Sequence, residues 1–235
     1  MAQTLDILAI GAHPDDVEMT SGGLLALASS RGQKTGALHL SKGEMGTRGT
    51  PAQRVREAEA AARALGLSSL DFAGLEDGHV WCNEQSVAIV VAFIRRLRPS
   101  LVICPYTTCH HPDHEQAAQV VLRAVHFAGK ARYEQASGEP HNVQGLLHAR
   151  YSANFEPSFY VDVSAVAETK RKAIECYTSQ FDAKPGEPQT RLSNPRFLDQ
   201  LLARGMAFGL AAGCLDAEAY RSAGPLVMKD PVAFF

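Results

Sequence analysis

The first half of the chain alternates short apolar runs with amphipathic segments of helical length, and this alternation constrains the fold more than any other feature. The apolar runs are 5–12, 35–41, 70–74 and 101–106, and the helix-like stretches begin after Ser21 and at 52–65, 86–97 and 114–128. Strands that alternate with helices of this length form βαβ units with right-handed crossovers, and therefore a parallel sheet. Gly66 stands where a helix C-cap is expected, and Pro99 separates a predicted helix from the next strand.

The second half of the chain is less regular. Two strands and two helices are expected there, at 146–153, 158–163, Ser164 to about Tyr177 and Asn194 to about Leu210, with Ser164 and Asn194 as caps. The polar stretch 134–144 is typical of a surface loop, and 178–192 is expected to be an irregular functional loop or subunit contact. Because no linker or repeat divides 1–235, we predict a single α/β domain with a Rossmann-like, mostly parallel sheet flanked by helices.

The charges of the chain are nearly balanced, with 23 Lys and Arg against 25 Asp and Glu. A chain without a basic patch lacks the footprint of a protein that binds nucleic acid or an anionic membrane, so we expect a small-molecule partner. The N-terminal sequence does not resemble a signal peptide, and no segment approaches the roughly 18 apolar residues of a membrane span. These features predict a cytoplasmic protein.

Five cysteines are present, an odd number without a C-x-x-C pair. This pattern argues against a disulfide framework and against a cysteine-type zinc knuckle. Most of the cysteines are expected to be small core residues. Cys109 is less certain because it stands beside a histidine cluster, although a reactive thiol requires an electropositive setting.

Two His/Asp clusters follow two of the predicted parallel strands. The first cluster runs from His13 to Glu18 and the second from His110 to Glu115, and each contains a His-Pro-Asp triplet. Ligand sites of open α/β sheets form beyond the carboxyl ends of the strands, so the two clusters are expected to converge. Either cluster alone is more simply explained as a helix N-cap or a turn, whereas two at equivalent places favour a functional site.

A catalytic zinc site needs three nitrogen or oxygen ligands and an open position. His13, one of Asp15 and Asp16, and a histidine of the second cluster would supply this set. The other aspartate is then free to act as a general base. His111 and His114 are three residues apart where a helix begins, so one can bind metal while the other faces the substrate. The pattern predicts a hydrolase.

A nucleotide-binding site is disfavoured at the same place. Gly11, Gly22 and Gly23 do not form the G-x-G-x-x-G turn that receives a pyrophosphate. The adjacent aspartates also put negative charge where the phosphates would lie.

The motifs together resemble those of the PIG-L/LmbE superfamily of zinc-dependent de-N-acetylases. The likeness rests on AHPDD (12–16) with Glu18, Gly22-Gly23, KGEMGTRG (42–49), Arg54, HPDH (111–114), CYTSQF (176–181), AEAY (217–220) and GPL (224–226). Within the superfamily the chain is most similar to the bacillithiol-biosynthesis deacetylases, which act on N-acetylglucosaminyl-malate. The resemblance spans nearly the whole chain, and it implies a small-molecule sugar substrate and a homo-oligomer, a hexamer or another assembly.

The resemblance also implies a role for each cluster residue. One Zn²⁺ per chain, or another divalent metal, would be held by His13, Asp16 and His114. Asp15 would be the base that activates the water. His111, supported by Asp113, would stabilise the oxyanion or protonate the departing amine. The order of the two aspartates comes from the resemblance alone.

Four further positions are candidate substrate contacts. The resemblance makes Arg54 a contact to a sugar hydroxyl, while its position on a basic helix also fits a solvated face. Thr47 and Arg48 stand in a loop that is either a substrate rim or a plain βα connection. His110 stands where the malate-specific relatives tend to have an arginine, and an imidazole is a weaker carboxylate partner. Trp81 is expected to pack rather than to carry a sugar ring.

Three functions remain open on these residues. The leading hypothesis is an N-acetylglucosaminyl-malate deacetylase of bacillithiol biosynthesis. A deacetylase of another sugar acetamide, such as an N-acetylglucosamine oligomer or thiol conjugate, is the second. A catalytically silent sugar-binding relative is the third, and a complete set of predicted ligands and base argues against it.

Overall fold

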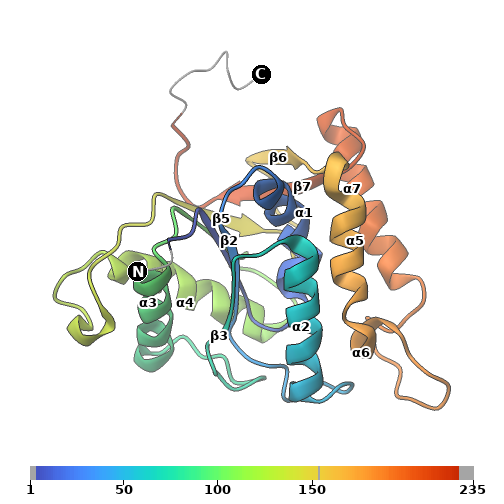
Figure 1. The fold of residues 1–235 in the computed structure, drawn as a ribbon, viewed down its shortest axis with the longest axis horizontal. Helices are drawn as coiled ribbons and strands as arrows, with labels where there is room; N and C mark the ends of the chain where they lie inside the picture. The colour runs from blue at the N-terminus through green and yellow to red at the C-terminus, as the bar shows by residue number, and fades with distance from the viewer. Residues whose placement is uncertain (1–3, 153, 228–235) are drawn as a thin grey trace.

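The computed structural model describes residues 4–152 and 154–227, and its centre is a seven-stranded sheet with the order β3-β2-β1-β4-β5-β7-β6 (Figure 1). The strands are β1 (Ile7–Gly11), β2 (Thr35–His39), β3 (Ser69–Phe72), β4 (Leu101–Pro105), β5 (Gly145–Ala149), β6 (Phe159–Asp162) and β7 (Ala217–Ser222). The five strands from β1 to β5 run parallel, and β7 is antiparallel to both β5 and β6. The predicted mostly parallel α/β sheet is confirmed.

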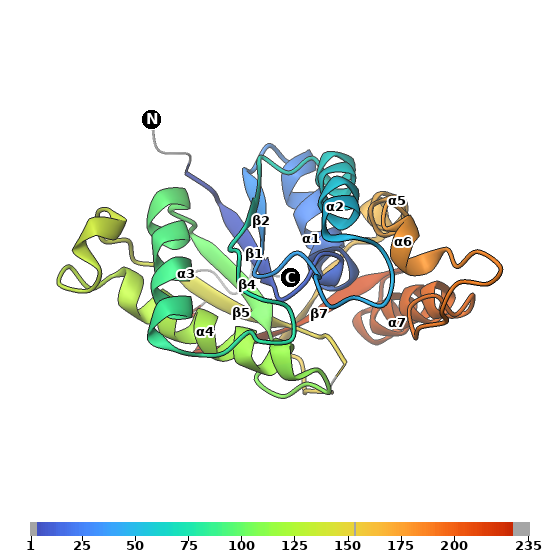
Figure 2. The same cartoon turned by 90° about the horizontal axis from the view of Figure 1, so that it is seen from below.

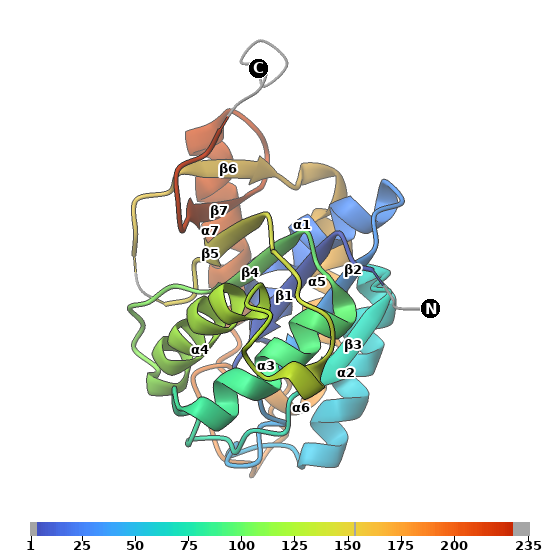
Figure 3. The ribbon, with the colours of Figure 1, turned by 90° about the vertical axis from the view of Figure 1, so that its left-hand side faces the viewer.

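Helices cover both faces of the sheet, as Figures 2 and 3 show from two directions. The helices are α1 (Asp16–Ser30), α2 (Pro51–Leu65), α3 (Glu84–Leu97), α4 (Pro112–Ala128), α5 (Ala167–Glu175), α6 (Thr178–Phe181) and α7 (Phe197–Ala212), with 3₁₀ turns η1 (Gln135–Ser137) and η2 (Ser164–Val166). Apolar side chains of α3 and α4 form one core against the sheet, and those of α1, α2 and α5 form a core on the opposite face. No helix in 4–152 or 154–227 is both long and apolar enough to cross a membrane.

The ends of α2 show why the local sequence folds as it does. The Thr50 side chain accepts a hydrogen bond from the backbone N–H of Gln53, and Pro51 occupies the first turn, where its missing N–H costs nothing. Gly66 ends the helix with φ +71°, a left-handed conformation that glycine adopts without strain. The predicted C-cap at Gly66 is confirmed.

Helix α1 begins at Asp16, whereas it was predicted to begin only after Ser21, and the prediction is wrong there. Gly23 lies inside this helix for a packing reason. A Cβ on Gly23 would lie 2.9 Å from the carboxylate of Glu218 and equally close to Val163. The helix therefore runs through its glycines because they allow α1 to approach the strand β7.

Strand β7 was not predicted from apolar periodicity. It inserts between β5 and β6 and carries Glu218, which is buried. The Glu218 carboxylate accepts hydrogen bonds from the backbone of Gly23 and Leu24, and it forms an ion pair with Lys170 at 2.7 Å. Glu218 is the second residue of this six-residue strand, and its buried charge interrupts the apolar pattern from which strands are predicted.

The remaining elements of the second half differ from prediction at their ends. The strand predicted at 146–153 ends at Ala149, and its last position lies outside the described residues. Ser164 starts the turn η2 and Asn194 precedes α7, so neither side chain is the direct N-cap of the helix that follows. The segment predicted to be irregular, 178–192, contains the short helix α6 and is otherwise a loop.

Candidate metal centre

The two His/Asp clusters meet where the direction of strand order reverses. Strand β1 lies between β2 and β4, and the chain leaves β1 towards one side of the sheet and β4 towards the other. The residues after β1 lead directly into α1, and those after β4 lead into α4. A crevice at such a switch point is the usual ligand site of an open α/β sheet. The predicted convergence of the clusters is confirmed.

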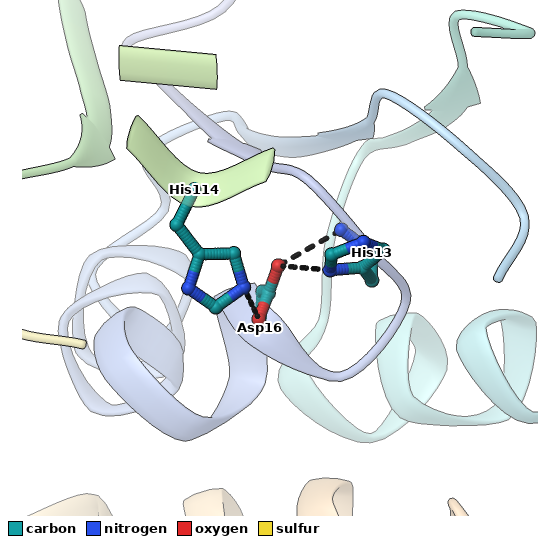
Figure 4. A group of neighbouring side chains, drawn as sticks. All are labelled: His13, Asp16 and His114. Carbon is teal, nitrogen blue, oxygen red and sulfur yellow. Dashed lines mark hydrogen bonds and ion pairs between the residues drawn. The ribbon is translucent and has the colours of Figure 1, made fainter. Parts of the chain in front are cut away.

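Three side chains form a group that could hold a metal ion: His13, Asp16 and His114 (Figure 4). Their candidate ligand atoms all lie within 4.8 Å of one another. Asp16 lies between the two imidazoles, with Oδ2 3.4 Å from His13 Nδ1 and Oδ1 3.2 Å from His114 Nε2. Two imidazoles and one carboxylate are the ligand types and the number found in catalytic zinc sites.

The surroundings of His13 fit a metal ligand. Its Nε2, on the far side of the ring from Asp16, lies 3.0 Å from Asp77 Oδ1 and 3.2 Å from Asp113 Oδ2. A histidine that binds metal through one nitrogen commonly has the other held by a carboxylate, which orients the ring. Buried carboxylates on both sides of His13 also favour a positive charge at this point.

The pKa values of His13, Asp16 and His114 show that this group favours positive charge on its imidazoles and negative charge on its carboxylate. Burial alone would lower the pKa of His13, but hydrogen bonds to Asp113 and Asp16 raise it well above its ordinary value. Burial works against a charged His114 as well, yet the Asp16 carboxylate raises the pKa of His114 to about 9. Burial would raise the pKa of Asp16, and the two imidazoles hold it well below the usual range. The group therefore attracts cations strongly.

Asp15 lies beside this group in an unusual backbone conformation. It caps α1 with φ +95°, which is uncommon for a residue with a side chain and is found at functional sites. Its carboxylate is buried and accepts a hydrogen bond from Arg54 at 2.9 Å. Burial raises the pKa of Asp15 to about 7 against the opposing charge of Arg54. A carboxylate with a pKa near neutrality suits a general base.

A family model agrees with this geometry: residues 8–125, half of the chain, match PIG-L, the GlcNAc-PI de-N-acetylases. The chain belongs to the PIG-L family. It is accordingly a hydrolytic deacetylase of N-acetyl groups. The matched segment contains both His/Asp clusters.

Curated PIG-L relatives act on several sugar conjugates. The chain is 28% identical to the diacetylchitobiose deacetylase of Thermococcus kodakarensis, over 74% of this chain and 70% of that protein. It is 28% identical to the 1D-myo-inositol 2-acetamido-2-deoxy-alpha-D-glucopyranoside deacetylase of Rhodococcus erythropolis, over 89% and 92% of the two chains. It is 25% identical to a probable N-acetyl-alpha-D-glucosaminyl L-malate deacetylase 2 of Bacillus cereus, over 80% and 89%.

Among solved structures, the conserved protein TT1542 from Thermus thermophilus superposes with a TM-score of 0.87 and 34% identity. The match covers 96% of this chain and 97% of that chain. The whole described fold, including the antiparallel strands near its C-terminal end, is therefore shared with another protein.

The Asp113 carboxylate forms its hydrogen bonds with Gly78 and His13, and the support of His111 by Asp113 stays a prediction. Its carboxylate accepts a hydrogen bond from Gly78 N at 2.7 Å and contacts His13, so among the described residues it orients the opposite cluster. His111 caps α4, and its Nδ1 accepts a hydrogen bond from the backbone N–H of Asp113 at 3.2 Å. Partial burial and the charge of His13 lower the pKa of His111. A neutral ring that accepts through Nδ1 carries its proton on Nε2.

Arg48 and Arg54 are both buried, and both have protein partners. Arg48 donates to the backbone oxygens of Ser179 and Asp182 at 2.8 and 2.7 Å, and it pairs with Glu187. This guanidinium anchors the segment that follows α6, because most of its donors are already occupied, and its role at a substrate rim stays a prediction. Arg54 holds Asp15, so the solvated-face interpretation of Arg54 is wrong.

The other candidate contacts lie at the surface. Thr47 and His110 are exposed, and the backbone N–H of His110 donates to Ser152 Oγ at 3.2 Å. Trp81 is 56% exposed, so its predicted packing role is wrong. These exposed side chains are free to meet a substrate.

Three features of the site escaped prediction. Asp77, which contacts His13, is a single aspartate in the loop after β3, and its only signal was its place at the end of a third parallel strand. Beneath the site, the Tyr177 hydroxyl donates to Glu18 at 2.9 Å, and burial raises the pKa of Glu18 to about 8. His39 Nδ1 contacts the backbone oxygen of His13 at 3.0 Å and so supports the loop.

Proposed function

We propose that this PIG-L protein is a zinc-dependent deacetylase that hydrolyses the acetamide of an N-acetylglucosamine conjugate. The observation that carries the proposal is the group of buried His13, buried Asp16 and partly buried His114, with the buried Asp15 directly beside it. The donor set fits one Zn²⁺, and other divalent metals accept the same ligands. The relatives named above act on N-acetylated glucosamine derivatives, which supports this substrate class.

The reaction breaks the C–N bond of the acetamide and releases acetate and an amine. A divalent metal at this site would polarise the acetyl carbonyl and make a water molecule more acidic. Asp15 accepts the proton of the attacking water through its carboxylate, and Arg54 holds that carboxylate in place. His111 faces the solvent side, and its Nε2–H is available to donate to the oxygen that becomes negative. The amine then leaves with the proton from Asp15.

The test combines metal analysis with an assay of acetate release. We expect about one zinc per chain and release of acetate from an N-acetylglucosaminide. His114→Ala should lose both the metal and the activity. Asp15→Asn should keep the metal and lower turnover by about two orders of magnitude or more, because an amide cannot accept the proton. Stoichiometric zinc in His114→Ala, or normal turnover in Asp15→Asn, would contradict the assigned roles.

The leading substrate in this proposal is N-acetylglucosaminyl-malate, as in bacillithiol biosynthesis. A carboxylate-bearing aglycone needs a cation at the mouth of the site, and His110 is exposed beside the second cluster. Neither Arg48 nor Arg54 is free for this task, since both guanidinium groups bind the protein. This observation favours a second candidate with a neutral aglycone, such as an N-acetylglucosamine oligomer.

His110→Arg distinguishes the two substrates. A guanidinium binds a carboxylate with two parallel hydrogen bonds, so the variant should raise kcat/KM for the malate conjugate several-fold. It should leave kcat/KM for diacetylchitobiose unchanged. A wild-type enzyme that already prefers the malate conjugate strongly, and that is indifferent to the substitution, would show that His110 does not contact the aglycone.

A further inference from the structure

A thiol lies on the far side of His114 from the metal group. Cys109 stands in the loop between β4 and α4, and its Sγ is 3.2 Å from His114 Nδ1. The same sulfur is 2.8 Å from Ser152 Oγ. The backbone N–H of Cys109 donates to Glu115 on the first turn of α4 at 2.8 Å, which fixes the loop to the helix that carries His114.

The two nitrogens of His114 must have different roles in a metal site. Nε2 faces Asp16 at 3.2 Å, so this nitrogen is the one that binds metal. A neutral imidazole that binds through Nε2 carries its proton on Nδ1, and that proton needs an acceptor to keep the ring in place. Cys109 Sγ is the acceptor that the structure provides.

Ser152 completes a chain of hydrogen bonds behind the ring. Its Oγ accepts from the backbone N–H of His110 and can also accept the S–H of Cys109. When the S–H of Cys109 donates to Ser152 Oγ, a lone pair of the sulfur is left to accept the hydrogen bond from His114 Nδ1–H. The Cys109 S–H and the His114 Nδ1–H then each have an acceptor.

The two metal-facing histidines are therefore held differently. The outer nitrogen of His13 meets the carboxylates of Asp77 and Asp113, whereas the outer nitrogen of His114 meets a thiol. Sulfur is the weaker acceptor. Replacing the thiol by a carboxylate should therefore preserve the orientation of His114, and replacing it by an alkyl group should release the ring.

We propose that Cys109 is a positioning residue of the metal site, whose sulfur accepts the Nδ1 proton of His114 and keeps Nε2 directed at the metal. The inference rests on the proposed function, because it assumes that His114 is a ligand. It gives Cys109 a role beyond that of a small core residue. Cys109 itself is not part of the groups of described residues that could hold a metal.

The test measures metal affinity of the intact protein by competition between the protein and a chelator for Zn²⁺, with the absorption spectrum of the Co²⁺ form as a second readout. Cys109→Val keeps the size of the side chain and removes the acceptor. It should lower Zn²⁺ affinity about 10- to 100-fold and alter the Co²⁺ spectrum. Cys109→Asp should bind Zn²⁺ within a few-fold of wild type. Cys82→Val, a half-buried cysteine outside the site, is the matched control and should not change affinity.

Wild-type affinity in Cys109→Val would overturn the proposal, as would a folded Cys109→Asp that binds metal as poorly as Cys109→Val. Ser152→Ala provides a second route if the valine variant does not fold. It removes the support of the thiol together with the acceptor of the His110 N–H, and it leaves the sulfur in place. It should weaken Zn²⁺ binding several-fold, and unchanged binding would count against the proposal. Failure of the proposed function is separate, since it would appear as wild-type protein that binds Zn²⁺ and releases no acetate.

Discussion

Arg54→Met should move the pH profile of deacetylation, because Arg54 controls the charge of Asp15. The Arg54 guanidinium is buried and lies 2.9 Å from Asp15 Oδ2. Burial raises the pKa of Asp15, and the positive charge of Arg54 is the largest influence that lowers it again. Methionine fills a similar volume without the charge. The base then loses its proton only at higher pH, so the acidic limb of kcat/KM should move upwards.

The size of the shift follows from the geometry. Two unit charges centred ~4 Å apart interact by about 4 kcal/mol at an effective dielectric constant of ~20, and one pKa unit corresponds to about 1.4 kcal/mol. The full Coulomb energy would move the pKa of Asp15 by about three units, and relaxation of the site reduces this, so we expect roughly one to three units. At a pH below both limbs, kcat/KM should fall ~10- to ~1000-fold. A bound cation lowers the starting pKa but leaves the direction unchanged.

The assay is acetate release by the metal-loaded enzyme between pH 5 and pH 9. Arg56→Met, an exposed arginine on the same helix, is the control and should keep the wild-type profile. If Arg54 instead binds a sugar hydroxyl, Arg54→Met will raise KM equally at every pH and leave the acidic limb where it is. That outcome would refute the argument that Arg54 acts through Asp15.

Three further predictions concern other parts of the molecule. His111→Ala should lower kcat by about two orders of magnitude with little change in metal content, as expected for a group that acts in the transition state; a change confined to KM would make it a binding residue. Lys170→Met should lower the free energy of unfolding in urea by roughly 3 kcal/mol, because Glu218 stays buried without its counter-charge. The control Lys172→Met changes an exposed lysine and should have little effect. Equal free energies of unfolding for the two variants would contradict this prediction. We also expect a homo-oligomer that buries the apolar side of α7, where Leu210 is 85% exposed in the single chain. Leu210→Asp should therefore reduce the mass measured by light scattering. A monomeric wild-type protein would refute the assembly.

The packing of α7 is a part of the fold that could not be predicted from the sequence. The large apolar side chains of α7 include Phe197, Leu201, Leu202, Met206 and Phe208. In the structure only Gly205 and Gly209 of α7 are fully buried, because their lack of side chains lets the helix approach Asp216 and Leu215 closely. A helix that packs through glycines shows no apolar periodicity on its buried face, so the sequence does not indicate which face is buried.

In the site, residue type and spacing predicted where a metal group would form, whereas the choice of Asp16 and His114 as ligands came from the family resemblance, and the hydrogen bonds around the group were not predicted. His13, Asp16 and His114 belong to motifs and lie at strand ends, so both their chemistry and their meeting point could be inferred. The partners of those residues depend on side-chain directions between segments that lie far apart in the sequence. Arg54 and Asp77 reach the site from separate loops or helices, and nothing in their local sequence indicates which atom they contact.

The two His-Pro-Asp triplets illustrate how equal sequences acquire different roles. In the first triplet, Asp15 adopts a left-handed conformation and α1 starts only at Asp16, so the side chains of both His13 and Asp16 turn towards the metal group and Asp15 stands beside them. In the second triplet the helix starts at its proline, so the histidine becomes the cap of α4 and remains exposed. The metal-facing histidine of that cluster is then the one three residues later, on the first helical turn. The starting point of each helix, and not the triplet itself, decides which side chain can bind metal, which is why spacing alone left the two aspartates undistinguished.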